Sequence, residues 1–179
     1  MVLFAVSITI LSQTYLSFIR LSHRTANSAV IQQDMRFALE YMSRNIRNIP
    51  IDYPTPPSSL EAVTSTLSLK EANQPAWIIE KTNPGDIRCS DDADVACLLV
   101  SSDGGASWAP ITAKHVNVEK FNIYIRPVQS PFTLVGNNYL NDEQPFVTIQ
   151  AKLTYKTAIE KEKVSLETQT TISSRVYER

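Results

Sequence analysis

Hydrophobic positions dominate the start of the chain, and their pattern then changes from continuous to periodic. Residues 1–19 (MVLFAVSITILSQTYLSFI) contain no charged side chain. A helix of this length spans roughly 28 Å, about the thickness of a bilayer core. From Arg20 to about Asn48 neither proline nor glycine occurs, and apolar residues recur at spacings of three and four. This spacing is typical of an amphipathic helix. The recurring positions are Val30, Ile31, Met35, Ala38, Met42, Ile46 and Ile49.

The two stretches together predict one helix over residues 1–49, on the order of 70 Å long, which ends at Pro50. We expect residues 1–19 to be a transmembrane and assembly segment and residues 20–49 to bury their apolar stripe against a globular partner. On the polar side, the spacing of Glu40 and Arg44 predicts a favourable i, i+4 pair. The alternative is a single-span anchor followed by a coiled-coil stalk.

Beyond Pro50 the pattern indicates strands. Residues 50–75 are rich in proline and serine and predict a surface connector, with a short helix near residues 59–65. Residues 76–179 predict a β-rich globular head, because short apolar runs and alternation recur between polar loops. The expected strands are 76–81, 95–101, 116–128, 145–155 and 163–176.

Turn and bulge signals refine this head. Asp103-Gly104-Gly105 predicts a hairpin turn after the second strand, and the alternation in residues 116–128 requires a bulge near Glu119. The last three strands predict an antiparallel sheet with one face in water. The apolar stripe of the helix is the only long cover left for its other face, so the predicted fold class is α+β.

Charge and motifs narrow the function classes. The formal net charge is −1, with 17 basic and 18 acidic residues spread along the chain. A nucleic-acid partner is not expected, because it requires a basic face. The sequence contains no G-x-S-x-G, H-E-x-x-H, P-loop or G-x-G-x-x-G motif. We therefore do not expect an enzyme, and no catalytic residue is assigned.

Two small groups of residues carry candidate chemistry. Cys89 and Cys97 lie eight positions apart in a polar segment, and a disulfide between them would stabilise the loop by about 2.5 kcal/mol in an oxidising compartment. Two independent thiols are the alternative. Asp91, Asp92 and Asp94 are weak calcium candidates, because they lack the spacing of an EF-hand loop. Solvated carboxylates are the alternative there, and no other metal or cofactor is expected.

The long helix followed by a small β-sheet domain resembles type IV pilins and type II secretion pseudopilins. The ending VSLETQTTISSR (residues 164–175) resembles the closing strand of J-class minor pseudopilins and related minor pilins. Residues 100–111, with Asp103-Gly104-Gly105 and Trp108-Ala109-Pro110, and residues 121–125 are also similar. The resemblance covers most of the chain in architecture but only these stretches in motif.

This resemblance implies a filament subunit, a minor one rather than a major one, of a type IV pilus or type II secretion pseudopilus. The implied partners are other pilin subunits, the membrane, an assembly platform, a motor ATPase and a leader peptidase. The subunit would cross the cytoplasmic membrane once before assembly and lie in a periplasmic or extracellular filament afterwards. Its assembly interface is expected at Val2, Leu3, Phe4, Val6, Ile8, Ile10, Leu11, Leu16, Phe18 and Ile19.

The start of the sequence departs from the family pattern. Members carry a basic leader, a glycine before the processing site and an acid at the fifth mature position, where this sequence has Ala5. Its first residues align better with the part of family members just after that motif, so the processing region either lies upstream of Met1 or is lacking. The alternative function is a single-span, extracytoplasmic domain that binds a glycan, a peptide or calcium, with the Trp108 hairpin as one of its surfaces.

Overall fold

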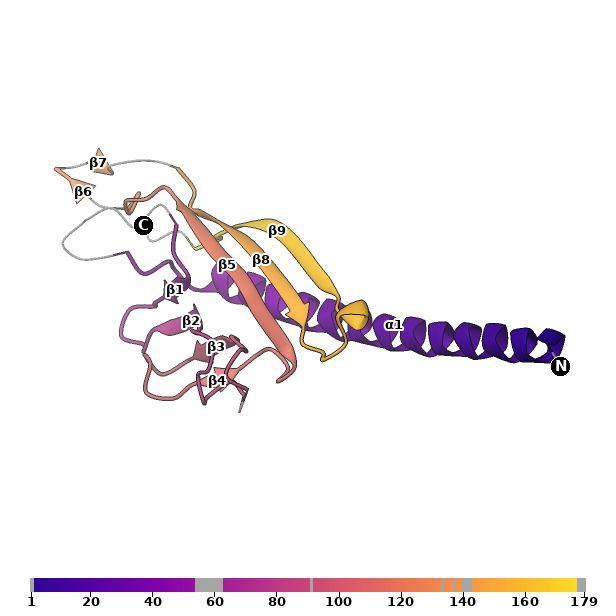
Figure 1. Cartoon of the computed structure of the whole chain (residues 1–179). Helices are drawn as coiled ribbons and strands as arrows, with labels where there is room; N and C mark the ends of the chain where they lie inside the picture. Colours follow the sequence, from indigo (N-terminus) through magenta and orange to yellow (C-terminus); the bar gives the residue numbers. More distant parts are fainter. Residues whose placement is uncertain are drawn as a thin grey trace.

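One unbroken helix organises the molecule. The computed structural model describes residues 2–53, 63–90, 92–132, 134–136, 138–139 and 143–176; in the first six residues of the chain it describes only the side chain of Phe4. Helix α1 (Val2–Asn48) has 47 residues, and Figure 1 shows it running straight out of the β-rich head at its N-terminal end. The last helical hydrogen bond joins Ile49 N–H to Asn45 O at 2.8 Å, immediately before Pro50. The predicted helix is confirmed.

The head contains two larger antiparallel sheets. The first has the order β1-β2-β3-β4, with β1 (Thr66–Leu69), β2 (Trp77–Lys81), β3 (Leu98–Ser101) and β4 (Ala109–Pro110). The second has the order β5-β8-β9, with β5 (Val116–Arg126), β8 (Phe146–Tyr155) and β9 (Ser165–Ser173). A short pair is formed by β6 (Leu134–Val135) and β7 (Asn138–Tyr139), and a 3₁₀ turn η1 (Glu160–Glu162) precedes β9.

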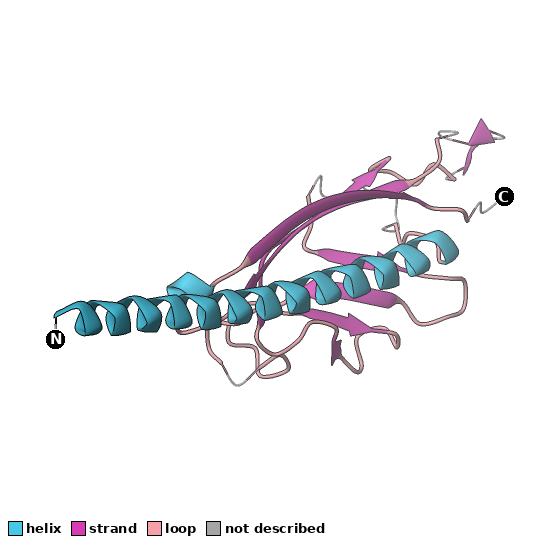
Figure 2. Cartoon of the chain, turned by 90° about the vertical axis from the view of Figure 1, so that its right-hand side faces the viewer, coloured by secondary structure: helices cyan, strands magenta, loops and turns pink. Residues whose placement is uncertain are grey.

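The core lies between the C-terminal half of α1 and these two sheets. Figure 2 shows strands above and below that half of the helix, whereas the N-terminal part of the helix projects beyond them. The helix contributes a buried row at spacings of three and four: Ile31, Met35, Ala38, Met42 and Ile46. Alternate residues of β5 and β8, such as Ile123 and Ile149, are fully buried against it. The α+β fold predicted from the pattern is therefore observed.

Polar contacts join one flank of the helix to the head. Trp77 Nε1 donates to Tyr41 Oη at 3.4 Å, and the two rings lie 5.8 Å apart. Asp34 Oδ2 accepts a hydrogen bond of 2.7 Å from the backbone N–H of Ala113. Nearer the free end, Asn27 Nδ2 donates to the carbonyl oxygen of Glu162 at 3.3 Å. These contacts supplement the apolar row and fix the rotation of the helix relative to the sheets.

Several details differ from the sequence-based expectations. The connector predicted over residues 50–75 contains β1, which pairs with β2 and so belongs to the head. Of the short helix expected at residues 59–65, only 63–65 lie among the described residues, and there Thr64 bridges to Ile123 instead. Residues 95–97 are buried but precede β3. Among the ion pairs of the described residues, none joins Glu40 to Arg44.

The remaining strand predictions are confirmed, with bounds shifted by a few residues. The bulge expected near Glu119 is present as a register shift between Val118 and Lys120. The bulge shifts the inward–outward alternation of β5 by one residue. As a result Val116 and Val118 before it, and Phe121 and Ile123 after it, all face the core. The turn at Asp103-Gly104-Gly105 joins β3 to β4, and both glycines have positive φ angles.

Met42 tests the packing of the helix on the head. The side chain is 1 % exposed, and Met42→Ala leaves a cavity between helix and sheets. We expect this change to lower the free energy of unfolding by about 2–5 kcal/mol, measured by denaturant titration. The control is Arg44→Ala on the exposed side, which we expect to stay within about 0.5 kcal/mol of the unsubstituted protein. Equal effects of the two changes would contradict this core.

Asp34 gives a prediction for pH. Burial raises the pKa of its carboxyl above the ordinary 3.8, although the hydrogen bond from Ala113 opposes the shift. The folded protein therefore favours protonated Asp34: the stabilising contribution is complete below about 3.8 and is lost as the pH rises through the raised pKa. An asparagine side chain stays neutral and keeps an acceptor, so Asp34→Asn should be more stable than the parent at pH 7. Denaturation curves at pH 3 and pH 7 should show the advantage shrinking in acid, and a constant difference would refute it.

Candidate assembly interface

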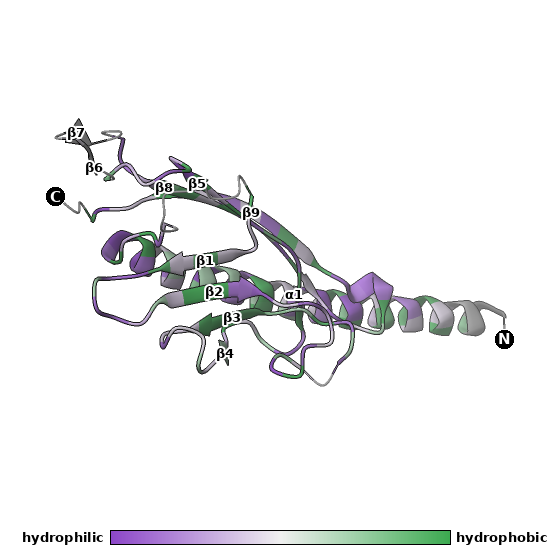
Figure 3. Ribbon diagram, turned by 90° about the vertical axis from the view of Figure 1, so that its left-hand side faces the viewer, coloured by the Kyte–Doolittle hydropathy of each residue, from purple (hydrophilic) through white to green (hydrophobic). Residues whose placement is uncertain are grey.

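The N-terminal part of α1 extends beyond the head and exposes large apolar side chains. We call residues 2–22 of α1 the projecting segment; just beyond it, His23 Nδ1 lies 3.5 Å from Glu162 Oε2. Figure 3 shows apolar residues, in green, along this segment of the ribbon. Phe4, Leu11 and Phe18 are each 69–70 % exposed. Such a density of exposed apolar residues indicates a surface that another molecule covers.

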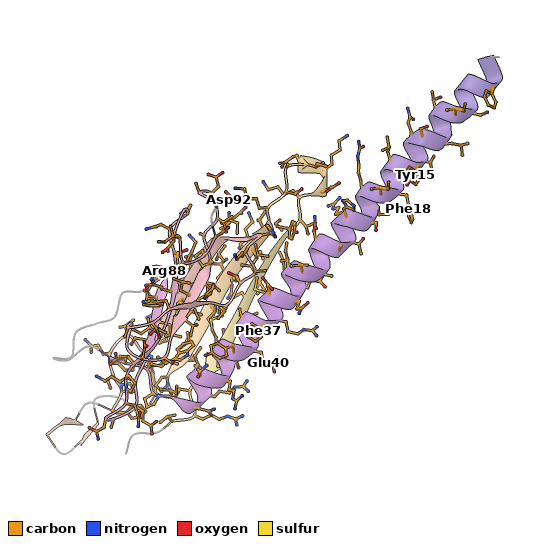
Figure 4. The ribbon with its side chains drawn as sticks, turned by 90° about the horizontal axis from the view of Figure 1, so that it is seen from below. Tyr15, Phe18, Phe37, Glu40, Arg88 and Asp92 are labelled. Carbon is orange, nitrogen blue, oxygen red and sulfur yellow. A yellow bond between two sulfur atoms is a disulfide. The ribbon has the colours of Figure 1, made fainter. Side chains whose placement is uncertain are left out.

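The structure describes seven of the ten side chains predicted for this interface. Six of them are exposed: Phe4, Ile8, Ile10, Leu11, Leu16 and Phe18. Ile19 is partly exposed, and the side chains of Val2, Leu3 and Val6 lie outside the described set. Tyr15, which the sequence-based selection omitted, is 66 % exposed and lies on the same helix as Phe18 in Figure 4. Its spacing from Leu11 and Phe18 is the signal that could have identified it.

Five of the exposed apolar residues in the projecting segment point to the same side of the helix. Phe4, Ile8, Leu11, Tyr15 and Phe18 follow spacings of four and three, so they share one face of the helix. At 100° per residue, this face points about half a turn away from the buried row that contacts the head. Gln13, Arg20 and Arg24 fall in line with the buried row instead, and Ile10 is an exposed apolar residue on that side. The projecting segment is therefore most apolar on the side away from the head.

Two hydroxyl groups of the segment donate hydrogen bonds to the backbone of their own helix. Thr14 Oγ1 donates to the carbonyl oxygen of Ile10 at 2.9 Å, and Ser17 Oγ donates to that of Gln13 at 2.8 Å. Farther along, Thr25 Oγ1 donates to Leu21 O at 2.9 Å. Hydroxyls bonded in this way need no partner from outside the helix. They are compatible with close packing against an apolar neighbour.

The membrane span expected over residues 1–19 is not confirmed. No helical stretch in the described part of the chain has the length and apolar character that a bilayer crossing requires. Ser12, Gln13, Thr14 and Ser17 lower the apolar character of that part. The side chains of residues 1–3, 5 and 6 lie outside it.

The calcium candidates have other partners. Lys156 Nζ lies 2.5 Å from Asp92 Oδ1 and 3.2 Å from Asp94 Oδ2, so an ammonium group stands between the two carboxylates. The hydrogen bond from Lys156 is the main cause that lowers the pKa of Asp92. Asp91 lies outside the described residues, and among those described no three acidic, histidine or cysteine side chains gather as metal ligands. The geometry thus gives no support to a calcium site.

The disulfide between Cys89 and Cys97 is confirmed, with their Cα atoms 5.7 Å apart. It forms a small cluster with Leu99 and the partly buried Trp108. The guanidinium of Arg88 lies 5.4 Å from the centre of the Trp108 ring and 2.6 Å from Asp86 Oδ2. The Trp108 indole N–H in turn donates to Gly105 O at 3.0 Å. These contacts tie the disulfide loop to the β3–β4 hairpin.

The two histidines and Asp103 also have contacts within the protein. The ring of His115 lies 6.3 Å from that of Tyr155, whereas His23 pairs with Glu162 at the start of the head. Asp103 accepts hydrogen bonds from Ser107 and Ser101, of which the Ser107 hydroxyl contributes most to holding the pKa of Asp103 well below its usual range. These bonds shape the hairpin turn.

Comparisons of the chain with protein-family models, curated proteins and solved structures give no match.

The Cys89–Cys97 disulfide is expected to stabilise the head. Replacing both cysteines by serine opens a loop with a sequence separation of 8, and the chain-entropy model gives a loss of about 2.5 kcal/mol in the free energy of unfolding. Denaturant titration of the variant and the parent, with and without reductant, measures it. Reductant should bring the parent to the stability of the variant and leave the variant unchanged. A parent insensitive to full reduction would contradict the role assigned to this bond.

Proposed function

We propose that this protein is a subunit of a pilus-like or pseudopilus-like filament, a minor subunit rather than a major one, and that it assembles through the projecting segment of α1. One observation carries the proposal. The helix continues past the head with large apolar residues exposed at spacings of three and four, on the side away from the head. A parallel bundle of such helices buries this side and leaves every head on the outside.

Energetics favour a bundle over a simple pair. Burying one large apolar side chain contributes about 1.5–3 kcal/mol, so the five residues of the exposed face contribute on the order of 10 kcal/mol. Association costs about 4–15 kcal/mol in lost freedom. A single partner therefore gives a marginal complex. Contacts with several neighbouring helices at once give a stable one, which is the arrangement of a filament core.

The middle of the helix has residues that suit close packing. On the face that carries Tyr15 and Phe18, the next positions toward the head are Ser22, Ala26 and Ala29. Small side chains let helix backbones approach one another closely. A neighbour whose bulky residues are shifted along the axis would fill the space above them. This supports staggered packing of parallel helices.

The resemblance to pilins supplies the rest of the proposal. Before assembly the subunit would reside in the cytoplasmic membrane with its head outside, and it would depend on a leader peptidase, an assembly platform and a motor ATPase. The disulfide is consistent with an oxidising compartment for the head. The features that motivated a ligand-binding receptor have internal partners: Lys156 binds Asp92 and Asp94, and Trp108 packs on the disulfide.

Leu11 tests the proposal. Leu11→Asp places a charge on the exposed apolar face, and we expect at least a tenfold loss of filaments counted by electron microscopy, because burying an unpaired charge is costly. The matched control is Gln13→Asp, which adds the same charge on the side facing the head and should retain most filaments. Unfolding curves should be equal for both variants, since neither position packs on the head. Equal filament yields from the two variants would refute the proposed interface.

A further inference from the structure

The outer edge of strand β9 has no pairing partner among the described residues. β9 is an end strand of the sheet β5-β8-β9, as Figure 1 shows, and all nine of its residues pair with β8 in one unbroken register. No backbone hydrogen bond joins its other edge to any described residue. A row of backbone N–H and C=O groups is therefore open along this edge.

The register shows which residues carry the open groups. Ser174 N–H donates to Pro145 O at one end of the β8–β9 ladder, and Tyr155 N–H donates to Val164 O at the other, each at 2.9 Å. Bonding direction alternates along an antiparallel strand, so the even-numbered residues of β9 bond to β8. The odd-numbered residues direct their N–H and C=O groups to the open edge, and all of them are exposed. They are Ser165, Glu167, Gln169, Thr171 and Ser173.

The other outer edges of the two larger sheets are short or already bridged. The outer edge of β1 is closed by residues 50–52, whose backbone exchanges hydrogen bonds with Ser68 and Lys70. On the outer edge of β5, Thr64 exchanges two backbone hydrogen bonds with Ile123. Strand β4, at the remaining edge, has two residues. β9 therefore differs from the other end strands in combining length with an open edge.

β9 also lacks the features that commonly prevent an open edge from pairing. Natural edge strands often carry lysine, proline or a bulge. The sequence SLETQTTIS contains neither lysine nor proline, and its register with β8 is regular. Its one charged side chain is paired within the same sheet: Lys120 Nζ lies 3.7 Å from Glu167 Oε1, and Gln150 Nε2 donates to this oxygen at 3.1 Å. The composition of β9 therefore favours pairing with a further strand.

A groove beside this edge has room for the side chains of an added strand. It has a volume of about 580 Å³ and lies between α1 and inward-facing residues of β9 such as Leu166 and Ile172. No residue of β5 or β8 is among its described lining, so it lies at the open edge of the sheet. Leu39 contributes an apolar wall on the helix, and the charges of Arg36 and Glu40 there are of opposite sign. The groove therefore suits uncharged, apolar side chains.

We propose that the open edge of β9 binds an extended segment of another polypeptide, which adds a further strand to the sheet β5-β8-β9. The backbone groups of the edge bind the backbone of the segment and contribute affinity. The α1–β9 groove receives every second side chain of the segment and selects those that are apolar. The partner is thus a protein with an exposed stretch in which apolar and polar residues alternate. This surface belongs to the head, so the inference goes beyond the proposed filament and does not rest on it.

Binding of a synthetic peptide to the full-length protein tests the proposal. The probe is a fluorescent peptide in which threonine and valine alternate between two terminal lysines, and fluorescence anisotropy is followed up to about 0.5 mM protein. Gln169→Pro removes an outward N–H but no bond to β8, and its ring obstructs the edge, so affinity should fall about tenfold or more. Gln169→Ala keeps the N–H and should bind as the parent does. Unfolding curves check that both variants are folded.

Methylated peptides test the pairing on the unsubstituted protein, and they decide the matter if Gln169→Pro does not fold. The N–H groups of an extended strand point alternately to its two edges. One isomer of the probe is therefore N-methylated on two threonines and the other on two valines. Only one edge of the peptide faces β9, so one isomer should bind about tenfold more weakly and the other should bind as the probe does.

Three results would overturn the proposal. The first is no binding of the unmodified probe, and the second is equal affinity of the two methylated isomers. The third is a concentration-dependent dimer of the protein that Gln169→Pro abolishes, because the edge would then belong to a second copy. Leu11→Asp should bind the probe as the parent does, so a failure of the proposed filament and a failure of this inference are distinguishable.

Discussion

The structure depends on the contact between one row of helical residues and two sheets. Among the described residues of α1, the buried side chains are those of Ile31, Met35, Ala38, Met42 and Ile46. Each sheet alone exposes an apolar face and would be marginal in water. The helix covers both faces at once, so the two sheets share one core although their described strands form separate ladders. Flank contacts at Asp34 and Tyr41 then fix the helix about its axis, which determines where every other residue of the helix points.

This fixed rotation connects the fold to the proposed assembly. A helix is a rigid element, so the row that faces the head also sets the direction of residues two or more turns beyond it. Phe4, Leu11, Tyr15 and Phe18 lie about half a turn from that row. A bundle formed through them places the heads outside without strain in the chain. If the same residues were rotated toward the head, the heads would collide with the bundle axis.

The sequence predicted the helix, its end at Pro50 and the β5-β8-β9 sheet because their signals are local and periodic. The bulge at Glu119 was also predictable, since β5 otherwise loses its alternation. β1 was missed because its four residues, in a proline- and serine-rich stretch, are too few to show an alternating pattern. Its pairing with β2 depends on tertiary packing and not on local sequence. The direction of the interface follows from the buried row, whose members the spacing also predicted, so it was accessible from the sequence as well. The partners of Asp92 and Asp94 were unpredictable, because Lys156 is more than sixty residues away in sequence.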